Sequence, residues 1–277
     1  MKKIGFIDYY LDEWHANNYP KFIKECSNGR YEVAYAYGKI DSPKGGMTNL
    51  EWSEKKGIAL LDTIEEVIEK SDILIVLSPD NPEMHEELAR LPLMSGKLVY
   101  VDKTFAPDKE TALRIFEIAD KYNTKCYSSS ALRFCSELKD IDKSKIHKIY
   151  SEGQYGYDEY SIHQIEPVIK LMETRAKRVM ALGDKTHPSY IIEFVDGRLA
   201  ELYQGPGKQF KITVADAENM CTEYPLNSNY FNLFIENLVE FFDTGVVQVP
   251  HEQTVDVIAV REAGLKAFEN PFTWVEV

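Results

Sequence analysis

The first 127 residues alternate between short apolar runs and amphipathic segments, and no other feature of the sequence constrains the fold as strongly. The apolar runs have strand length and occupy residues 4–7, 31–37, 72–77, 97–101 and 125–128. Helical periodicity lies between them, at residues 63–70, 81–91 and 108–122, with Asp62 or Thr63 and Asp108 as suitable N-caps. Strands that alternate with helices form a parallel sheet covered on both faces. We therefore predict an α/β protein whose residues 1–127 form a Rossmann-type, doubly wound parallel sheet.

The second half of the chain has a different order of elements. Residues 146–150, 189–195, 198–203 and 210–214 are strand-like, and the Asp196-Gly197 pair between the middle two is typical of a hairpin turn. Helix-like segments occupy residues 161–175, 230–244 and 254–270. Strands in series with flanking helices predict an α+β domain with a mainly antiparallel sheet, over residues 128–277.

Charge and cysteine content exclude several classes of partner. The formal net charge of -13 argues against a nucleic acid or an anionic membrane as partner, because the surface as a whole repels phosphates. None of the four cysteines forms a C-x-x-C pair, and the histidines lack metal-ligand spacing, so no metal site is expected. The first apolar run meets Asp8 too early for a signal peptide or a membrane span. We expect a cytoplasmic protein with a small-molecule ligand.

Ligands of doubly wound sheets lie outside the carboxyl ends of the strands. Two segments there carry motifs: Ser78-Pro79, followed by His85, and Asp102-Lys103-Thr104. A third motif, Glu159-Tyr160-Ser161-Ile162-His163, lies in the second half, and the chain closes with the helix-like stretch VPHEQTVDVIAVREAGLKAF. Together these features resemble the Gfo/Idh/MocA oxidoreductase family, and the resemblance spans nearly the whole chain.

The resemblance implies hydride transfer between NAD or NADP and a sugar, polyol or related hydroxy compound. It implies a catalytic group of Lys103, His163 and Glu159, with Arg133 and Tyr160 near the substrate. The residues expected at the cofactor are Asp8, Tyr10, Leu11, Gly38, Ser78, Pro79, His85 and Asp102. It also implies a homo-oligomer paired through the open face of the second-domain sheet.

The residues themselves leave alternatives open. Partial burial makes a lysine a usable proton carrier, a role open to Lys103, but a lysine at the start of a loop is often only solvated. Imidazole side chains suit proton transfer near neutral pH, and His163 lies four residues after Glu159, so one helix face holds both if the helix extends that far back. A helix face with Glu159 and His163 is equally typical of a solvated polar surface without a catalytic role. Arg133 also suits a salt bridge at a domain junction, and His85 suits a structural role.

The resemblance fails after the first strand, where a dinucleotide fold needs G-x-G-x-x-G. Larger residues fill all three glycine positions, and Asp8, Asp12 and Glu13 bring negative charge to the place of two phosphates. Pro20 suggests that the next helix starts late or is kinked. Lys39 and Lys44 favour the ribose phosphate of NADP if they are more than loop charges.

The same loop holds a polar-aromatic cluster whose members are Trp14, His15, Asn17, Asn18 and Tyr19. Aromatic faces and amide side chains are typical sugar contacts, so Trp14, His15 and Asn18 are candidate substrate ligands. A surface loop that covers a missing phosphate site is the alternative. Two functions follow: an NAD(P)-dependent oxidoreductase, or a non-redox binding protein or enzyme that has lost normal dinucleotide binding.

Overall fold

The computed structural model describes residues 1–43, 45–218 and 220–277. Lys44, one of the two lysines considered for NADP, lies outside the described residues. The chain forms two compact units, Met1–Ser128 with Ile235–His251 and Ser129–Phe234 with Glu252–Val277. The first break is one residue from the boundary expected at 127. The prediction assigned all residues after 127 to the second domain, whereas Ile235–His251 belongs to the first unit.

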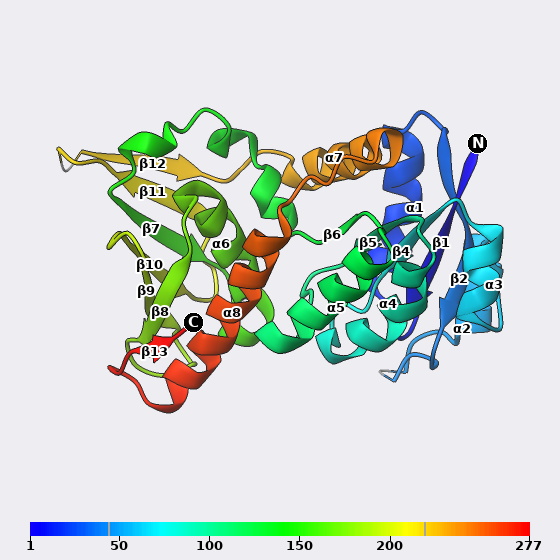
Figure 1. Ribbon diagram of the computed structural model, residues 1–277, viewed down its shortest axis with the longest axis horizontal. Coiled ribbons are helices and arrows are strands. Elements are labelled where there is room, and N and C mark those ends of the chain that lie inside the picture. The colour runs from blue at the N-terminus through cyan, green and yellow to red at the C-terminus, as the bar shows by residue number, and fades with distance from the viewer. Residues whose placement is uncertain (44, 219) are drawn as a thin grey trace. The chain divides into compact units, whose positions relative to one another are not determined.

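The first unit is built on a six-stranded parallel sheet (Figure 1). Its strands are β1 (Lys2–Asp8), β2 (Tyr31–Gly38), β3 (Ala59–Leu60), β4 (Ile73–Val76), β5 (Leu98–Val101) and β6 (Cys126–Tyr127). They lie in the order β3-β2-β1-β4-β5-β6, and every pair is parallel. This is the doubly wound order, in which the direction of winding reverses between β1 and β4. The predicted fold of the first half is confirmed.

The helices of this unit are α1 (Trp14–Cys26), α2 (Asn49–Lys56), α3 (Ile64–Lys70), α4 (His85–Met94) and α5 (Lys109–Lys121). A single 3-10 turn, Pro82–Met84, precedes α4. Helix α1 packs on β2, and α4 and α5 pack together; the right-handed rule for crossovers places α1 on the face of the sheet opposite α4 and α5. Thr63 and Asp108 accept the backbone N–H groups of Glu66 and Thr111, as expected of N-caps.

The expected late start of the helix after β1 is wrong. Helix α1 begins at Trp14, only six residues after β1 ends, and includes Pro20. The physical reason is an unusual N-cap residue. Glu13 occupies the position where serine, threonine, aspartate or asparagine is usual, and its carboxylate accepts backbone N–H groups of the first turn.

The second unit contains a seven-stranded mixed sheet. Its strands are β7 (Lys148–Gly153), β8 (Ala176–Ala181), β9 (Ser189–Phe194), β10 (Leu199–Gln204), β11 (Lys211–Ala215), β12 (Cys221–Pro225) and β13 (Val275–Glu276). Among the described residues, β7 and β10 are the one pair of strands in this sheet that run parallel, so the sheet is mainly antiparallel as predicted. The hairpin between β9 and β10 turns at Gly197, whose φ of +86° suits glycine.

The remaining helices are α6 (Tyr157–Met172), α7 (Tyr230–Thr244) and α8 (His251–Glu269), with 3-10 turns at Ala131–Phe134, Ser136–Leu138 and Lys143–Lys145. Within the second unit α6 packs on β7 and β10. It also meets α8 where the Tyr157 hydroxyl lies against Gly264; a Cβ there would lie 1.8 Å from that oxygen. Gly264 thus permits the close approach of the two helices.

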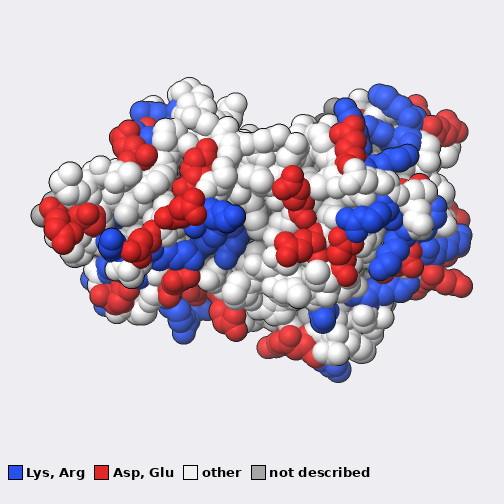
Figure 2. All heavy atoms as spheres, turned by 90° about the horizontal axis from the view of Figure 1, so that it is seen from above, with Lys and Arg blue, Asp and Glu red and all other residues white. Residues whose placement is uncertain are grey.

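Two surface properties bear on partners. On the face drawn in Figure 2, basic and acidic side chains are interspersed rather than gathered into one extended basic area. In the part of the chain that the structure describes, no helix is both long enough and apolar enough to span a bilayer.

Candidate functional site

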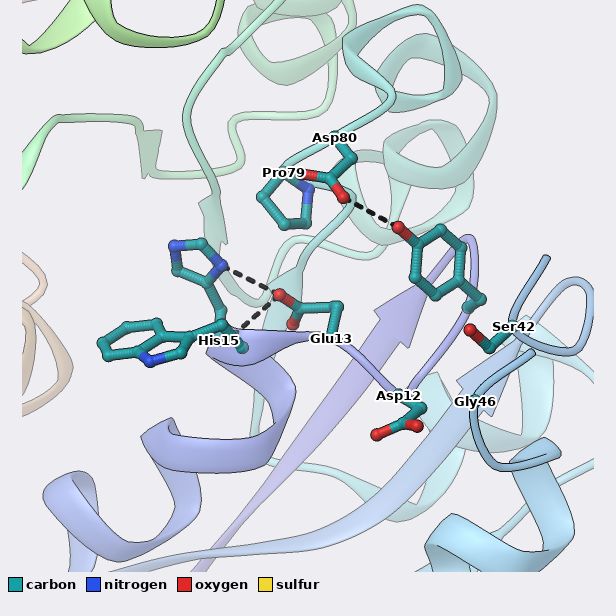
Figure 3. Close-up of a pocket in the computed structure, with 9 residues that line it drawn as sticks. Asp12, Glu13, His15, Ser42, Gly46, Pro79 and Asp80 are labelled. Atoms are coloured by element: carbon teal, nitrogen blue, oxygen red, sulfur yellow. Dashed lines mark hydrogen bonds and ion pairs between the residues drawn. The ribbon is translucent and has the colours of Figure 1, made fainter. Parts of the chain in front are cut away.

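A pocket of about 300 Å³ lies in the first unit, beyond the carboxyl ends of β1, β2 and β4 (Figure 3). Its lining combines carboxylates, aromatic rings and an imidazole: Tyr10, Asp12, Glu13, Trp14, His15, Ser42, Gly46, Pro79 and Asp80. The position agrees with the rule that ligands of doubly wound sheets lie at the strand ends where the winding reverses.

Glu13 closes the start of α1. One carboxylate oxygen accepts the backbone N–H of Ala16, and the other accepts that of His15 at 2.7 Å. The second oxygen also lies 2.9 Å from Nδ1 of His15 (Figure 3). The first N–H groups of a helix have no partner within the helix, so a carboxylate there supplies acceptors and also interacts favourably with the helix dipole.

His15 lies between two carboxylates. Its Nδ1 faces Glu13, and its Nε2 lies 3.8 Å from Oδ2 of Asp102. The ring packs edge-on against Trp14 and Tyr19, and its side chain is only 14% exposed. With Nδ1–H donating to Glu13, a neutral His15 keeps its lone pair on Nε2.

Asp8 and Asp102 are buried, and Asp102 lies 3.8 Å from His15, which lines the pocket. Asp8 Oδ1 accepts the Tyr9 backbone N–H at 2.7 Å, while Oδ2 has no hydrogen-bond partner among the described residues. Burial raises the pKa of Asp8 well above its usual value, and the nearby charges of Glu13 and Asp102 raise it further. Ionising Asp8 is therefore unfavourable in the folded chain.

The loops around the pocket are tied to one another. Asn49 accepts the Leu11 backbone N–H at 3.1 Å and donates to the carbonyls of Gly38 at 3.1 Å and Ile40 at 2.8 Å. This approach needs glycine at position 38, because a Cβ there would lie 2.5 Å from the Asn49 side chain. The loop after β1 is thus fixed to the loop after β2.

Two further hydrogen bonds fix the pocket wall. Asp12 accepts the backbone N–H of Met47 at 2.8 Å. The hydroxyl of Tyr10 donates to Asp80 at 2.8 Å and so joins the segments that follow β1 and β4 (Figure 3). The hydrogen bond between Tyr10 and Asp80 thus crosses the gap between the ends of β1 and β4.

These residues do not fit a dinucleotide held at α1. A pyrophosphate binds to free N–H groups at a helix start, and Glu13 already accepts those of His15 and Ala16. A phosphate there would meet the charge of Glu13, while glycine, which lets the backbone approach a phosphate, is absent from this loop.

The structure divides the residues predicted for the cofactor and substrate in this unit. Tyr10, Trp14, His15 and Pro79 line the pocket. The others do not, and most are buried: Asp8, Leu11, Ser78, His85 and Asp102. Gly38 contacts Asn49, and Asn18 donates its side-chain amide to the Trp14 carbonyl at 2.6 Å rather than lining the pocket.

The contacts of His85 are those of a structural residue and not of a cofactor ligand. It is fully buried, with Nε2 2.9 Å from the Leu77 carbonyl and Nδ1 2.9 Å from that of Thr104. Burial lowers the pKa of His85, although Asp102 acts in the opposite direction. The imidazole ties the end of β4 to the loop that contains half-buried Lys103.

In the second unit, His163 contacts a residue that the sequence did not indicate. Its Nδ1 lies 2.8 Å from the Ser130 hydroxyl, and its ring is 5.4 Å from that of Tyr160. Helix α6 does extend back to include Glu159, but this side chain is exposed. Ser130, rather than Glu159, is therefore placed to orient the imidazole.

Arg133 takes part in a buried ion pair within the second unit. Its guanidinium lies 3.2 Å from Glu166 and also donates to Gln253, while Lys170 donates to the Arg133 carbonyl at 2.7 Å. Burial raises the pKa of Glu166 despite this pairing, and burial lowers the pKa of Lys170 to about 8. Arg133 thus forms a salt bridge, as one of its two expected roles required, but the bridge lies within the second unit.

Asp80, Ser42 and Gly46 line the pocket but were not predicted as site residues. Asp80 directly follows Pro79 at a strand end, so the strand-end rule points to it. Ser42 and Gly46 lie in the loop after β2 without a motif. Within residues 1–43, 45–218 and 220–277, no three His, Cys, Asp or Glu side chains are grouped as metal ligands would be.

Comparison with known proteins identifies the fold. No family model and no curated protein sequence matches the chain. Among solved structures, a "probable dehydrogenase" from Thermotoga maritima has a TM-score of 0.81 at 15% identity, covering 99% of this chain and 98% of that one. Scyllo-inositol dehydrogenase from Lactobacillus casei, with bound NAD(H) and scyllo-inositol, has a TM-score of 0.78 at 15% identity, with the same two coverages, 99% and 98%.

GenD2 of gentamicin A biosynthesis, solved with NAD, has a TM-score of 0.78 at 12% identity, covering 100% of this chain and 97% of that one. The solved structures named here, which match over nearly the full length of the chain, are described as dehydrogenases or were solved with NAD. The resemblance to Gfo/Idh/MocA oxidoreductases seen in the sequence is confirmed for the fold.

Proposed function

We propose that the chain is a non-redox protein of this dehydrogenase fold, and that its first unit binds a small molecule bearing hydroxyl or amino groups. The observation that carries the proposal is the Glu13 carboxylate, which accepts the N–H groups at the start of α1. A protein that used a dinucleotide in the usual way would leave those donors to the pyrophosphate.

The pocket lining supports the class of ligand. Asp12, Glu13 and Asp80 bring carboxylates, and no lysine or arginine is among the described residues that line it. Carboxylates accept hydrogen bonds from hydroxyl and ammonium groups and repel anions. The rings of Tyr10 and Trp14 offer faces to a sugar or a cation.

His15 supplies a proton carrier at the same place. Glu13 holds its Nδ1 side, and the ring lines the pocket. An imidazole oriented by a carboxylate can take a proton from a ligand hydroxyl or ammonium, or return one. The pocket therefore suits binding and also acid–base chemistry on the bound molecule.

Thermal unfolding in the presence of candidate ligands tests the proposal. A ligand at ten times its Kd adds about 1.4 kcal/mol of stability, or about 3–6 °C for a chain of this size. We expect such a shift with glucosamine, glucose or scyllo-inositol, and none with millimolar NAD or NADP.

Trp14→Ala removes an aromatic face that is 53% exposed, so it should abolish the ligand shift with little effect on the free protein. Leu50→Ala, at a residue that is 59% exposed on α2 and outside the pocket, is the matched control and should keep the shift. A shift with NAD and none with the sugars would contradict the proposal.

An NAD(P)-dependent oxidoreductase acting on a polyol is the second candidate. Structures solved with NAD share the fold, and Lys103 follows β5 as the family resemblance requires. Under this candidate Lys103 and His163 are the catalytic pair, NAD or NADP stabilises the protein, and Lys103→Met abolishes turnover without unfolding it. A homo-oligomer and a cytoplasmic location stay predictions.

A further inference from the structure

We infer that the Glu13 carboxylate is a built-in replacement for the phosphate that a dinucleotide would bring to the start of α1, and that it excludes phosphate ligands from the first unit. The inference goes beyond the proposed function, because it concerns the ligands that the first unit excludes and not the one that it binds.

The three glycine positions of the usual fingerprint show how the replacement is built. Asp8, Tyr10 and Glu13 have the spacing of G-x-G-x-x-G, directly after β1. Each side chain is now engaged within the unit, since Asp8 is buried, Tyr10 donates to Asp80, and Glu13 caps α1. At the positions where the fingerprint has glycine, the loop therefore has larger side chains that are buried or bound to other groups of the same unit.

The Glu13 carboxylate accepts the same N–H groups that a phosphate bound at the start of a helix would use. Its two oxygens accept the backbone N–H groups of His15 and Ala16, and one also lies 2.9 Å from Nδ1 of His15. The residue itself is only 8% exposed, so the carboxylate is held in place rather than free in solvent. Donors that are satisfied in this way offer little to a second anion.

Charge adds to this exclusion. Asp12 and Asp80 line the same pocket and bring further carboxylates close to Glu13. A pyrophosphate would have to displace Glu13 and then remain beside it, with like charges in a poorly solvated place. Removal of Glu13 alone frees the donors, whereas removal of another pocket carboxylate only lowers the charge.

Binding of inorganic pyrophosphate to the parent protein and two variants tests the inference. In Glu13→Ser a hydroxyl keeps the N-cap, so α1 should form while the charge disappears. Asp80→Asn is the matched control, because it removes one charge from the same pocket and leaves the cap of α1 intact. Titration calorimetry at constant ionic strength should show no binding by the parent protein, and at least roughly tenfold tighter binding by Glu13→Ser than by Asp80→Asn, a difference of about 1.4 kcal/mol.

Backbone amide shifts of His15 and Ala16 in NMR spectra should respond to pyrophosphate in Glu13→Ser and not in the parent protein. If Glu13→Ser does not fold, Glu13→Gly decides the question, since glycine is tolerated at an N-cap and leaves the N–H groups of His15 and Ala16 without a side-chain acceptor. Pyrophosphate should then bind to Glu13→Gly more tightly than to Asp80→Asn. Equal binding by the parent protein and the Glu13 variants, or an equal gain from Asp80→Asn, would overturn the inference.

Discussion

Arg133→Met should lower the free energy of unfolding by about 3–5 kcal/mol at pH 7, the usual cost of removing one partner from a buried ion pair. Arg133 is 5% exposed and Glu166 is 3% exposed. Without the guanidinium, the Glu166 carboxylate keeps the Ser129 hydroxyl, at 3.1 Å, but loses its charged hydrogen-bond donor. Gln253 loses the hydrogen bond from Arg133 at the same time.

The loss should depend on pH, and its sign follows from the pKa of Glu166. Burial raises that pKa and Arg133 lowers it, so the variant has a still higher pKa in the folded chain. An acid with a raised folded pKa loses stability as pH rises from its unfolded pKa through its folded one. The variant should therefore be most destabilised near neutral pH and least destabilised near pH ~4, where Glu166 is largely protonated in both states.

Urea unfolding followed by circular dichroism measures both effects. Arg114→Met is the control, because Arg114 forms a comparable pair with Glu86 in which the side chains are 48% and 36% exposed. An exposed pair contributes at most about 1 kcal/mol. Adding Glu166→Gln to Arg133→Met should recover part of the loss. A loss below about 1 kcal/mol for Arg133→Met would show that the buried pair stabilises the unit no more than an exposed one.

The parallel sheet could be predicted because its strands are continuous apolar runs of the kind that sheets buried on both faces require. Strand β4, with all four residues buried, is the clearest case. The start of helix α1 was predicted wrongly for a specific reason. Its cap is a glutamate, outside the residue types preferred at that position, and Pro20 suggested a later start. Strand β12 is mostly exposed and lacks the apolar pattern that would have revealed it.

The site was predictable to the extent that it follows from strand ends. Tyr10, Trp14, His15 and Pro79 lie shortly after β1 or β4, and all four line the pocket. Which side chains point inward and which become buried depends on packing that no local pattern records. Glu13 illustrates the limit: its charge predicted repulsion of phosphates, but its role as the cap of α1 is visible only in the fold.

The roles of Ser130 and Arg133 were hidden for the same reason. Ser130 lies 33 residues from His163 in sequence, and only the fold brings the two together. Arg133 and Glu166 are separated by the same distance along the chain and meet for the same reason. Pairs of this kind have no spacing rule, whereas residues on one helix, such as Glu159 and His163, do.

Asp8→Asn should raise the stability of the protein at pH 7, because it removes a carboxyl group whose ionisation is less favourable in the folded chain than in the unfolded one. Burial, together with the charges of Glu13 and Asp102, raises the pKa of Asp8 well above its unfolded value. Ionised Asp8 therefore destabilises the folded chain increasingly as pH rises from the unfolded pKa towards the folded one. Asparagine at this position keeps an acceptor for the Tyr9 N–H and carries no charge.

The stabilisation should consequently disappear on acidification, because a protonated aspartic acid and an asparagine at position 8 are then nearly equivalent. Unfolding by urea at pH 7, 5.5 and 4 measures this decline. Asp72→Asn is the matched control: Asp72 also accepts a backbone N–H, from Lys3 at 2.7 Å, but it is exposed, so its replacement should have little effect at any of these pH values. A variant at position 8 that is less stable than the parent at pH 7 would contradict this expectation, because the carboxyl group would then stabilise the folded chain in a way that asparagine does not replace.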